Sequence, residues 1–343
     1  CNCLRKDFQV FYKILFQKNS AYDIIVSENI LEVLIMSGEK VIFCGNNPDF
    51  LDEKLTTLSD ASNGGNAFRI PSLIRSGNTL IAAIDRQSCG ADWGYIELAI
   101  RRSEDGGETW SDIQIIAIPP ARKTMLSDEC YGSAFYIDPC MAIAPNGDVL
   151  LLVDFYPECK GLHKRSILDK KKAPYALYNK EMRPTLYDRD GKFYVIDKSG
   201  HVLNHRYTDT GMTVDYESGE LYSGEAYLGN IHLNGKSPSN INEAGAKTTF
   251  GAPLKAPKRS YLYLLRSSDN GKTWSKPKDI TGQVLIKQDG TFLGVAPGVG
   301  LTTHKGRVIM PLYVDKKQTV SIYSIDDGEN WHRMAGSPLC RKC

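Results

Sequence analysis

The sequence predicts an all-β protein built from repeated four-stranded units, which is the architecture of a β-propeller. Three short segments share the pattern S-x-D-x-G-x-[TN]-W: SEDGGETW at 103–110, SSDNGKTW at 267–274 and SIDDGENW at 324–331. Each segment follows a run of strand-forming residues, respectively LAIRR, YLYLLR and TVSIY. Self-similarity of this kind indicates repeated copies of one supersecondary unit.

Two further apolar strands precede each repeated segment, joined by a turn that contains glycine. The strand pairs are FRIPSLI and TLIAAID in the first unit, YIDPCMAIA and VLLLVDF in the second, and FLGVAPGVGL and VIMPLYV in the third. The connecting turns are SGN, PNGD and KGR. Each unit is therefore predicted to be a meander of about four strands, with the repeated segment in its last turn.

The repeated segments, which we call Asp boxes, have a chemistry suited to closing a turn. Asp and Ser can bond the N–H groups of the turn, Gly adopts a backbone conformation that a side chain forbids, and Trp anchors the turn on apolar neighbours. We therefore interpret these residues as structural and not as a catalytic carboxylate set. They are Ser103, Asp105, Gly107, Trp110, Ser267, Asp269, Gly271, Trp274, Ser324, Asp326, Gly328 and Trp331.

The second unit contains an insertion. The distance from the second strand to the Asp box is 24 residues in the first unit and 16 in the third, but 118 in the second. Roughly 95 residues are therefore inserted within 158–250, far beyond ordinary loop length. The segments LYDRDGKFYVID and KSGHVLN carry strand and turn signals, which predicts a small β-rich domain. DRDG resembles the start of a calcium loop, but Ser199 stands where the loop requires glutamate, so no calcium site is expected.

Composition and charge exclude several classes of protein. The 42 Lys and Arg residues nearly balance the 40 Asp and Glu residues, for a net charge of +2, which does not favour nucleic acid as a partner. No stretch approaches the roughly 18 uninterrupted apolar residues of a membrane-spanning helix. The visible start shows no signal-peptide pattern, because its short apolar pieces are interrupted by charge.

The cysteines do not predict a cofactor. There are nine, an odd number, so at least one thiol is free or paired outside the chain. Cys1 and Cys3 at one end and Cys340 and Cys343 at the other could form a four-thiolate zinc site or remain uncoordinated tail thiols. We expect uncoordinated thiols, and no metal or cofactor.

Arg69 is the residue that most needs an explanation, since it lies between Phe68 and Ile70 in an apolar strand, NAFRIPSLI. An unpaired buried guanidinium is very costly. The side chain could extend to the surface or pair with a carboxylate of the chain. The alternative is that it meets a carboxylate that arrives with a ligand.

Taken together, these motifs resemble the bacterial exo-α-sialidases. The resemblance runs from about residue 40 to 335 and rests on FRIP, the Asp boxes, ADWGYIELAIRRSEDGGETW, DFYPECKG and FLGVAPGVGLTTHKGRVIMPLY. It implies a six-bladed β-propeller of which only about three blades are present. The predicted domains are an unassigned segment at 1–40, a partial propeller at 41–343 and the β-rich domain inserted at 158–250, which resembles insertions in larger bacterial sialidases.

The resemblance also implies roles for particular residues. Arg69 corresponds to the first of three arginines that bind the carboxylate of sialic acid, and Asp92 in ADWG to the acid/base aspartate. Asp138 in YIDP corresponds to the aspartate that contacts the N-acetyl and O4 region of the sugar. The apolar pocket around the acetyl methyl group would be formed by Ile70, Ile137, Phe155 and Tyr156.

Chemistry makes sense of these residue types. A guanidinium binds a carboxylate in a fixed bidentate geometry. The carboxylate on the anomeric carbon of sialic acid would repel an Asp or Glu nucleophile, and sialidases use tyrosine instead. Asp92 would protonate the leaving oxygen and later activate water, although a loop carboxylate that caps a turn is the alternative. Asp85 and Arg86 could form a supporting ion pair at the same rim.

Several parts of the family's site have no matching motif in the sequence. These are the tyrosine nucleophile, its glutamate partner and the other two arginines, so no residue is assigned to them. We expect the chain to be an exo-α-sialidase that releases terminal sialic acid with retention from glycoproteins, glycolipids and oligosaccharides. By itself it is expected to be poorly stable or oligomeric, and catalytically weak or inactive. The alternatives are an intramolecular trans-sialidase, an inactive module that binds sialylated glycans, and a scaffold propeller. The family resemblance implies a secreted or cell-surface protein.

Overall fold

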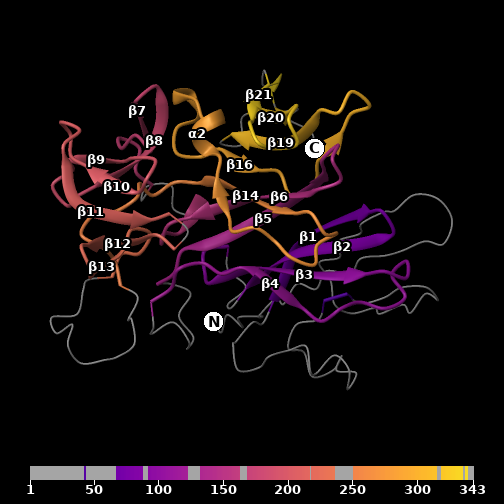
Figure 1. Ribbon diagram of the computed structural model, residues 1–343. Helices are drawn as coiled ribbons and strands as arrows, with labels where there is room; N and C mark the ends of the chain where they lie inside the picture. Colours follow the sequence, from indigo (N-terminus) through magenta and orange to yellow (C-terminus); the bar gives the residue numbers. More distant parts are fainter. Residues whose placement is uncertain are drawn as a thin grey trace, which may run out of the picture.

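The structure is a computed structural model (Figure 1). Its description covers residues 42–43, 67–87, 92–122, 132–162, 168–216, 218–235, 250–314, 318–334 and 337–338. Within these ranges the regular secondary structure is almost entirely β-strand, as predicted, and the regular helices are the short α2 (Thr281–Val284) and the 3₁₀ turn η6 (Lys287–Asp289). No helix in the described ranges has the length and apolar character needed to cross a membrane.

The first sheet contains four antiparallel strands in the order of the chain. The second strand is buried on both faces, because its apolar side chains pack on either side of the sheet. The Asp box at 103–110 lies between the third and fourth strands, as predicted from the repeat. The strands are β1 (Ala67–Ser76), β2 (Thr79–Gln87), β3 (Ile96–Ser103) and β4 (Gln114–Ala117).

The second sheet joins strands that are far apart in the sequence. β14 pairs with β6 from Tyr261 opposite Phe155 to Ser267 opposite Val149. The order is β15-β14-β6-β5-β17, with β17 parallel to β5. The chain between β6 and β14 therefore leaves this sheet and returns to it. The strands are β5 (Phe135–Ile143), β6 (Val149–Tyr156), β14 (Tyr261–Ser267), β15 (Lys278–Asp279) and β17 (Gly298–Val299).

The third sheet is built around the long antiparallel pair of β19 and β20, and the Asp box at 324–331 follows β20. Its order is β16-β19-β20-β21, with β18 also paired to β19 and β22 to β20. The strands are β16 (Gly294–Val295), β18 (Leu301–Thr302), β19 (Val308–Val314), β20 (Gln318–Ser324), β21 (His332–Arg333) and β22 (Ser337–Pro338).

A separate seven-stranded sheet, which we call the inserted sheet, lies between β6 and β14 in the chain and to one side of the other sheets (Figure 1). Its strands follow one another in chain order, and it has a hydrophobic cluster of its own. The strands are β7 (Tyr175–Tyr178), β8 (Glu181–Tyr187), β9 (Phe193–Ile196), β10 (His201–Leu203), β11 (Asp209–Asp215), β12 (Glu220–Ser223) and β13 (Ala226–Asn230).

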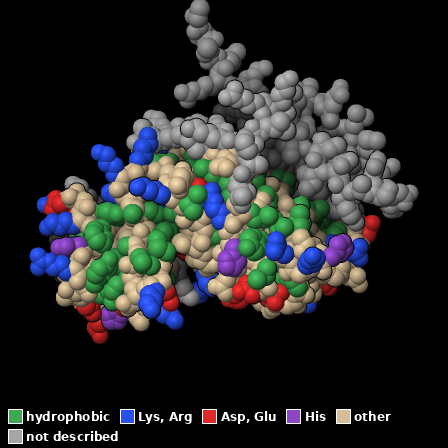
Figure 2. Space-filling model, turned by 90° about the horizontal axis from the view of Figure 1, so that it is seen from above, with side chains coloured by type: hydrophobic (Ala, Val, Ile, Leu, Met, Phe, Trp, Pro, Cys, Tyr) green, Lys and Arg blue, Asp and Glu red, His purple; other side chains and the backbone are tan. Residues whose placement is uncertain are grey.

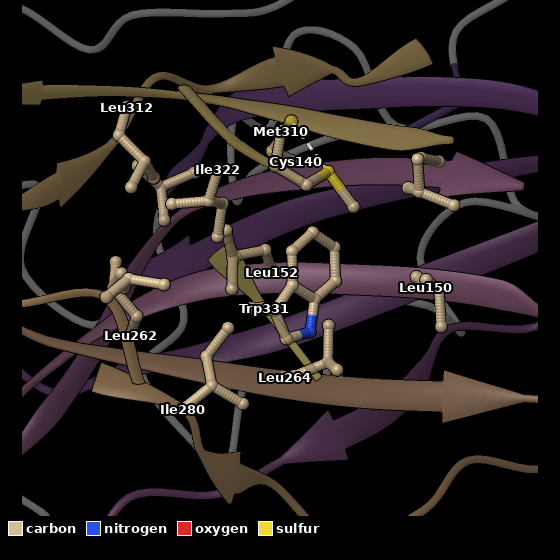
Figure 3. Packing of buried hydrophobic residues seen from close by; sticks show 14 of the residues in the cluster. Cys140, Leu150, Leu152, Leu262, Leu264, Ile280, Met310, Leu312, Ile322 and Trp331 are labelled. Atoms are coloured by element: carbon tan, nitrogen blue, oxygen red, sulfur yellow. Dashed lines mark hydrogen bonds between the residues drawn. The ribbon is translucent and has the colours of Figure 1, made fainter. Parts of the chain in front are cut away.

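Two large hydrophobic clusters hold the first three sheets together. One lies between the first and second sheets and includes Ile81, Leu98 and Leu151. The other lies between the second and third sheets, where Trp331 of the last Asp box points in among aliphatic side chains from β6, β14, β19 and β20 (Figure 3). Each fully buried aliphatic side chain contributes about 1.5–3 kcal/mol, so these clusters make a large favourable contribution to the free energy of folding.

The three Asp boxes have the same internal geometry. In the second box the hydroxyl of Ser267 accepts the N–H of Gly271 at 2.8 Å and donates to Asp269 at 2.8 Å. Asp269 in turn accepts the N–H of Thr273 at 2.9 Å. The first and third boxes repeat these bonds. Each box therefore closes the turn between the third and fourth strands of its sheet by local hydrogen bonds.

Candidate active site

Arg69 and Asp92 meet at the end of the first sheet. Arg69 is on β1, and Asp92 is on the connection between β2 and β3. The Nη1 of Arg69 donates a hydrogen bond to Oδ1 of Asp92. Their side chains are 24% and 47% exposed, so the ion pair is open to solvent on one side. The sequence left two explanations for Arg69, and in the structure it pairs with a carboxylate of the chain.

A local irregularity of the backbone helps to place Arg69. The pairing of β1 with β2 shifts between Arg69 and Ser72, which marks a β-bulge. Within it Ile70, the residue before Pro71, has a φ of 56°, a left-handed conformation that is rare for a β-branched residue. Such strain persists only where the surrounding structure enforces it, and it is often found at functional sites.

The same irregularity recurs at the equivalent position of the second sheet. The pairing of β5 with β6 shifts between Ile137 and Cys140, and Asp138 has a φ of 67° just before Pro139. β5 packs beside β1 and β2. The structure thus brings Asp138 close to Arg69 and Asp92, because the bulges on two neighbouring strands turn the backbone toward the same place.

Buried carboxylates surround this point. The N–H of Asp138 donates to Oδ2 of Asp85 at 3.4 Å, and Asp85 is fully buried. Burial, followed by the charges of Asp92 and Arg69, which act in opposite directions, raises the pKa of Asp138 to about 7. Burial and the nearby charge of Asp138 raise the pKa of Asp85 well above its usual range.

Asp154 on β6 is a further buried carboxylate, and it connects the second sheet to the third. It accepts the N–H of Val295 at 3.0 Å. Burial, and then the charge of Asp138, raise its pKa well above the usual range. We did not predict a role for Asp154. The signal in the sequence is an acidic residue inside the otherwise apolar run VLLLVDFY.

The expected ion pair between Asp85 and Arg86 does not form. Successive residues of a strand point to opposite faces of the sheet. Asp85 therefore faces Asp138, whereas Nη1 of Arg86 donates to Oε2 of Glu97 at 2.8 Å. Asp85 thus belongs to the carboxylate group of the site, and Arg86 does not.

The predicted apolar pocket is brought together only in part. Ile137 and Tyr156 belong to one hydrophobic cluster, and Trp93, next to Asp92, packs against it. Phe155 does not join them, because it is next to Tyr156 on β6 and points to the opposite face. There it stacks on Tyr263 with ring centroids 4.7 Å apart. Ile70 is partly exposed, within the bulge of β1.

Tyr313 on β19 is the tyrosine of the third sheet that faces these carboxylates. Burial, and then the charges of Asp154 and Asp138, raise its pKa. A nucleophilic phenol needs the opposite shift, toward neutrality. We therefore do not assign Tyr313 as a nucleophile, and its contact at 4.8 Å with the ring of Phe292 is an ordinary aromatic packing contact.

No group of three or more His, Cys, Asp or Glu side chains suited to a metal ion occurs in the part of the chain that the structure describes. The four terminal cysteines that could have formed a zinc site, Cys1, Cys3, Cys340 and Cys343, lie outside that part. Cys140 and Cys159 are buried free thiols.

Comparison with known protein families gives one matching family model. The model for the BNR repeat-like domain matches residues 70–340. This range includes all three Asp boxes, the proposed contact residue Asp138 and the aspartate of ADWG, and it begins one residue after Arg69.

Curated relatives include an anhydrosialidase of Macrobdella decora and sialidase B of Streptococcus pneumoniae. The first is 29% identical over 304 residues, covering 78% of this chain and 38% of the relative. The second is 25% identical over 326 residues, covering 83% of this chain and 44% of the relative. The chain thus spans less than half the length of either relative.

Solved structures show the same fold. The intramolecular trans-sialidase from Ruminococcus gnavus in complex with oseltamivir carboxylate superposes with a TM-score of 0.63 and 25% identity, over 81% of this chain and 62% of that one. The NanB sialidase of Streptococcus pneumoniae superposes with a TM-score of 0.68 and 20% identity, over 84% of this chain and 48% of that one.

Proposed function

The chain belongs to the BNR repeat-like domain family, and on that premise we propose that it carries part of the active site of an exo-α-sialidase, which hydrolyses terminal α-linked sialic acid from glycoproteins, glycolipids and oligosaccharides. The observation that carries the proposal is the meeting of Arg69 and Asp92 beside Asp138. A carboxylate-binding cation next to a carboxylate that can exchange a proton is what cleavage of an acidic sugar requires.

The three sheets that carry Asp boxes correspond in this proposal to three blades of a six-bladed β-propeller. The strand order β1-β2-β3-β4 of the first sheet, and the repeated position of the Asp box, support blades that are copies of one unit. The inserted sheet corresponds to the β-rich domain proposed for 158–250. It leaves and rejoins the second blade at β6 and β14, which pair directly.

The Arg69–Asp92 ion pair gives the proposed reaction its first step. A guanidinium binds a carboxylate in a fixed bidentate geometry. The carboxylate of an incoming sialoside therefore takes the place of Asp92 on Arg69. Arrival of the substrate in this way releases Asp92 to act as the general acid on the leaving oxygen.

Cleavage then proceeds in two displacements at the anomeric carbon. In the first, a nucleophile forms a bond to the anomeric carbon as the bond to the glycosidic oxygen breaks, and the electron pair of that bond leaves with the oxygen, which receives the proton of Asp92. In the second, Asp92 takes a proton from a water whose oxygen bonds to the anomeric carbon and displaces the nucleophile, and the two displacements together give retention. Asp138 contacts the N-acetyl and O4 region, and Ile137 and Tyr156 pack against the acetyl methyl group. The nucleophile is not assigned to a residue of this chain.

Sialoside binding to the purified chain tests the role of Arg69. We expect Arg69→Ala to weaken binding of 3′-sialyllactose about tenfold or more, because a charge-assisted hydrogen-bonded pair is lost. Arg75→Ala is the matched control, since Arg75 is an exposed arginine on the same strand. Asp92→Asn should bind at least as tightly as the wild type, because it removes the carboxylate that competes for Arg69. Weaker binding by Asp92→Asn would contradict the exchange.

Hydrolysis tests the role of Asp92. Asp92→Asn should lower the cleavage of 3′-sialyllactose about 100-fold or more, because its leaving group needs a proton. The rate of cleavage of a 4-methylumbelliferyl sialoside should fall much less in this variant, because its leaving group is good without protonation. Equal losses on the two substrates would remove Asp92 from the role of proton donor. Binding without any cleavage by the wild-type chain would favour a sialoglycan-binding module.

The intramolecular trans-sialidase reaction is the second candidate. The similarity to the anhydrosialidase of Macrobdella decora and to the intramolecular trans-sialidase from Ruminococcus gnavus supports considering it beside hydrolysis. In this reaction a hydroxyl of the sugar itself, and not water, attacks the anomeric carbon. NMR analysis of the released sugar separates the two, since hydrolysis gives free sialic acid and the intramolecular reaction an anhydro sugar. Sialylated glycans are the substrates in either reaction. We also propose that the protein is secreted or located at the cell surface.

A further inference from the structure

A cavity of about 780 Å³ lies between the inserted sheet and the second sheet, away from the candidate active site. Its walls come from β8 of the inserted sheet on one side, and from β14, residues 276–279 and α2 on the other. Arg69, Asp92 and Asp138 are not among its lining residues. Its volume lies in the range of small-molecule sites, about 300–1,000 Å³.

Fixed aromatic rings form one side of this cavity. Tyr261 and Tyr263 alternate along β14 and so face the same way. Phe155 packs against two of the lining rings. Its ring is stacked on that of Tyr263 and meets the ring of His232 edge-on, with ring centroids 4.9 Å apart. The cavity thus offers a rigid aromatic surface, which binds the apolar face of a ligand at little cost in conformational entropy.

His232 supplies a polar group without a partner. Its Nδ1 is buried and forms no hydrogen bond within the described ranges. Burial lowers the pKa of His232 to about 3, so the imidazole is neutral at physiological pH. A buried ring nitrogen without a partner is unfavourable. A ligand hydroxyl would satisfy it, because a hydroxyl can both donate and accept.

The mouth of the cavity exposes two apolar side chains, Tyr216 at 42% and Met182 at 49%. The hydroxyl of Tyr216 donates to the backbone carbonyl of Asp197, which fixes the ring in place. Hydrophobic side chains are visible on the side of the molecule that carries β7 and β8, with Lys and Arg around them (Figure 2). A fixed and exposed ring at a cavity mouth is suited to stacking against a flat ligand.

The charges around the cavity nearly cancel. Arg183 forms an ion pair with Glu181, two residues away on the same strand, β8. The lining contains three cationic and two acidic side chains, which are Arg183, Lys276, Lys278, Glu181 and Asp279. This balance does not favour a strongly charged ligand. Aromatic faces with hydroxyl-binding groups between them favour a ring that has apolar C–H faces and a rim of hydroxyls.

We propose that this cavity is an accessory site for an uncharged pyranose ring of a glycan. The ring lies against Tyr216 and Tyr263, and one of its hydroxyls bonds Nδ1 of His232. The site holds a neutral part of a glycan on the inserted side of the molecule. The inference goes beyond the proposed function, since it requires neither hydrolysis nor the Arg69 site.

Binding of lactose, a neutral disaccharide, to the purified chain tests the proposal by saturation-transfer NMR and calorimetry. The wild type should bind saturably with a Kd on the order of millimolar. Tyr216→Ala should weaken binding at least tenfold, and His232→Phe, which keeps the ring and removes its nitrogens, should weaken it several-fold. Tyr207→Ala is the matched control and should bind as the wild type does, since Tyr207 is 44% exposed in the same segment and packs on Tyr178.

Three results would overturn the proposal. The first is the absence of saturable lactose binding up to about 50 mM. The second is equal lactose binding by the Tyr216→Ala and Tyr207→Ala variants. If Tyr216→Ala does not fold, Met182→Ala replaces it in this comparison, because Met182 is also at the mouth of the cavity. The third is loss of lactose binding in Arg69→Ala, which would place lactose in the active site and leave the proposed function standing. If Arg69→Ala binds lactose and 3′-sialyllactose with equal affinity, the cavity recognises the neutral lactose unit that the two ligands share.

Discussion

Asp85, Asp138 and Asp154 are three carboxylates of neighbouring strands, and the fold keeps them largely out of water. Asp85 and Asp154 are 0% and 1% exposed. Carboxylates this close together cannot all be ionised at low cost. Burial and mutual repulsion therefore raise the pKa values of Asp85 and Asp154. The cluster therefore makes the stability of the folded protein depend on pH near neutrality.

Asp138 allows this dependence to be tested. Its pKa rises from 3.8 to about 7 on folding. A raised carboxyl pKa favours the folded state at low pH, and this contribution is lost as the pH rises from about 4 through about 7. Asp138→Asn, which stays neutral, should therefore be more stable than the wild type at pH 8 by about 1–3 kcal/mol, with a smaller difference at pH 5. Urea unfolding at the two pH values measures this.

Asp190→Asn serves as the control for this measurement, because Asp190 is on an exposed turn with 68% of its side chain accessible. Its stability relative to the wild type should be the same at both pH values. A stability difference for Asp138→Asn that is equal at pH 5 and pH 8 would mean that Asp138 does not hold its proton in the folded protein.

For single residues, the sequence predicted which side chains lie close together better than it predicted the partners of those side chains. Arg69, Asp92 and Asp138 are indicated by short motifs and are close together in the structure. The expected ion pair of Asp85 with Arg86 does not form, and Phe155 lies in a different hydrophobic cluster from Ile137 and Tyr156. Both findings concern which face of a strand a side chain occupies, and two adjacent apolar or charged residues in a buried strand do not reveal this in the sequence.

Among the elements, the bulges of β1 and β5 and the Asp boxes repeat from sheet to sheet. Both bulges place a non-glycine residue with positive φ directly before a proline. A bulge turns side chains away from the regular alternation of a strand. The local sequences R-I-P and I-D-P thus allow two neighbouring strands to direct Arg69 and Asp138 toward one point.

Replacing Ile70 with glycine tests the strain in the first bulge. Glycine adopts the left-handed conformation freely, and relief of about 1–2 kcal/mol of strain should offset most of the lost side-chain packing. Ile70→Gly should therefore change the free energy of unfolding by less than about 1 kcal/mol. Ile74→Gly, at a regular position of the same strand, should cost about 2–3 kcal/mol. Equal costs at the two positions would show that Ile70 is unstrained.

Removing the hydroxyl of Ser267 tests the Asp box. Ser267 is 2% exposed, and its hydroxyl bonds both Gly271 and Asp269. Ser267→Ala leaves a buried N–H without its acceptor, so it should lower the free energy of unfolding by about 1–3 kcal/mol. Ser223→Ala, at an exposed position of β12, should change it by less than about 0.5 kcal/mol. A neutral Ser267→Ala would mean that the apolar cluster alone closes the turn.

For the whole molecule, the junction between the inserted sheet and the second sheet is the feature with the widest consequences. Phe155 is in the second sheet, and it contacts His232 of the inserted segment and Tyr263 of β14. Glu158, two residues after the end of β6, accepts a hydrogen bond from the N–H of Asn234 at 2.7 Å and another from Nη2 of Arg122 at 2.8 Å. Aromatic packing and buried polar contacts together hold the two parts in a fixed relation.

Truncation of Phe155 should therefore destabilise more than its own sheet. Phe155→Ala should cost about 3–5 kcal/mol in free energy of unfolding, as expected for a fully buried aromatic ring. Hydrogen exchange should also become faster in β11 to β13 of the inserted sheet, because the contact with His232 is lost. Phe193→Ala, at a partly buried position of β9, is the control and should cost less. Unchanged exchange in the inserted sheet would show that the two parts are not coupled through Phe155.

The sequence by itself determined the strand-rich class and the repeat of the Asp boxes, and it predicted an insertion in the second unit and a site that contains Arg69, Asp92 and Asp138. These follow from local patterns, since turn chemistry and strand periodicity act over a few residues. Only the tertiary structure decided that Arg69 pairs with Asp92, that Asp85 and Asp154 join Asp138, and that a cavity opens beside the inserted sheet. These depend on the register and packing of strands far apart in the chain, where a shift of one residue reverses every side chain.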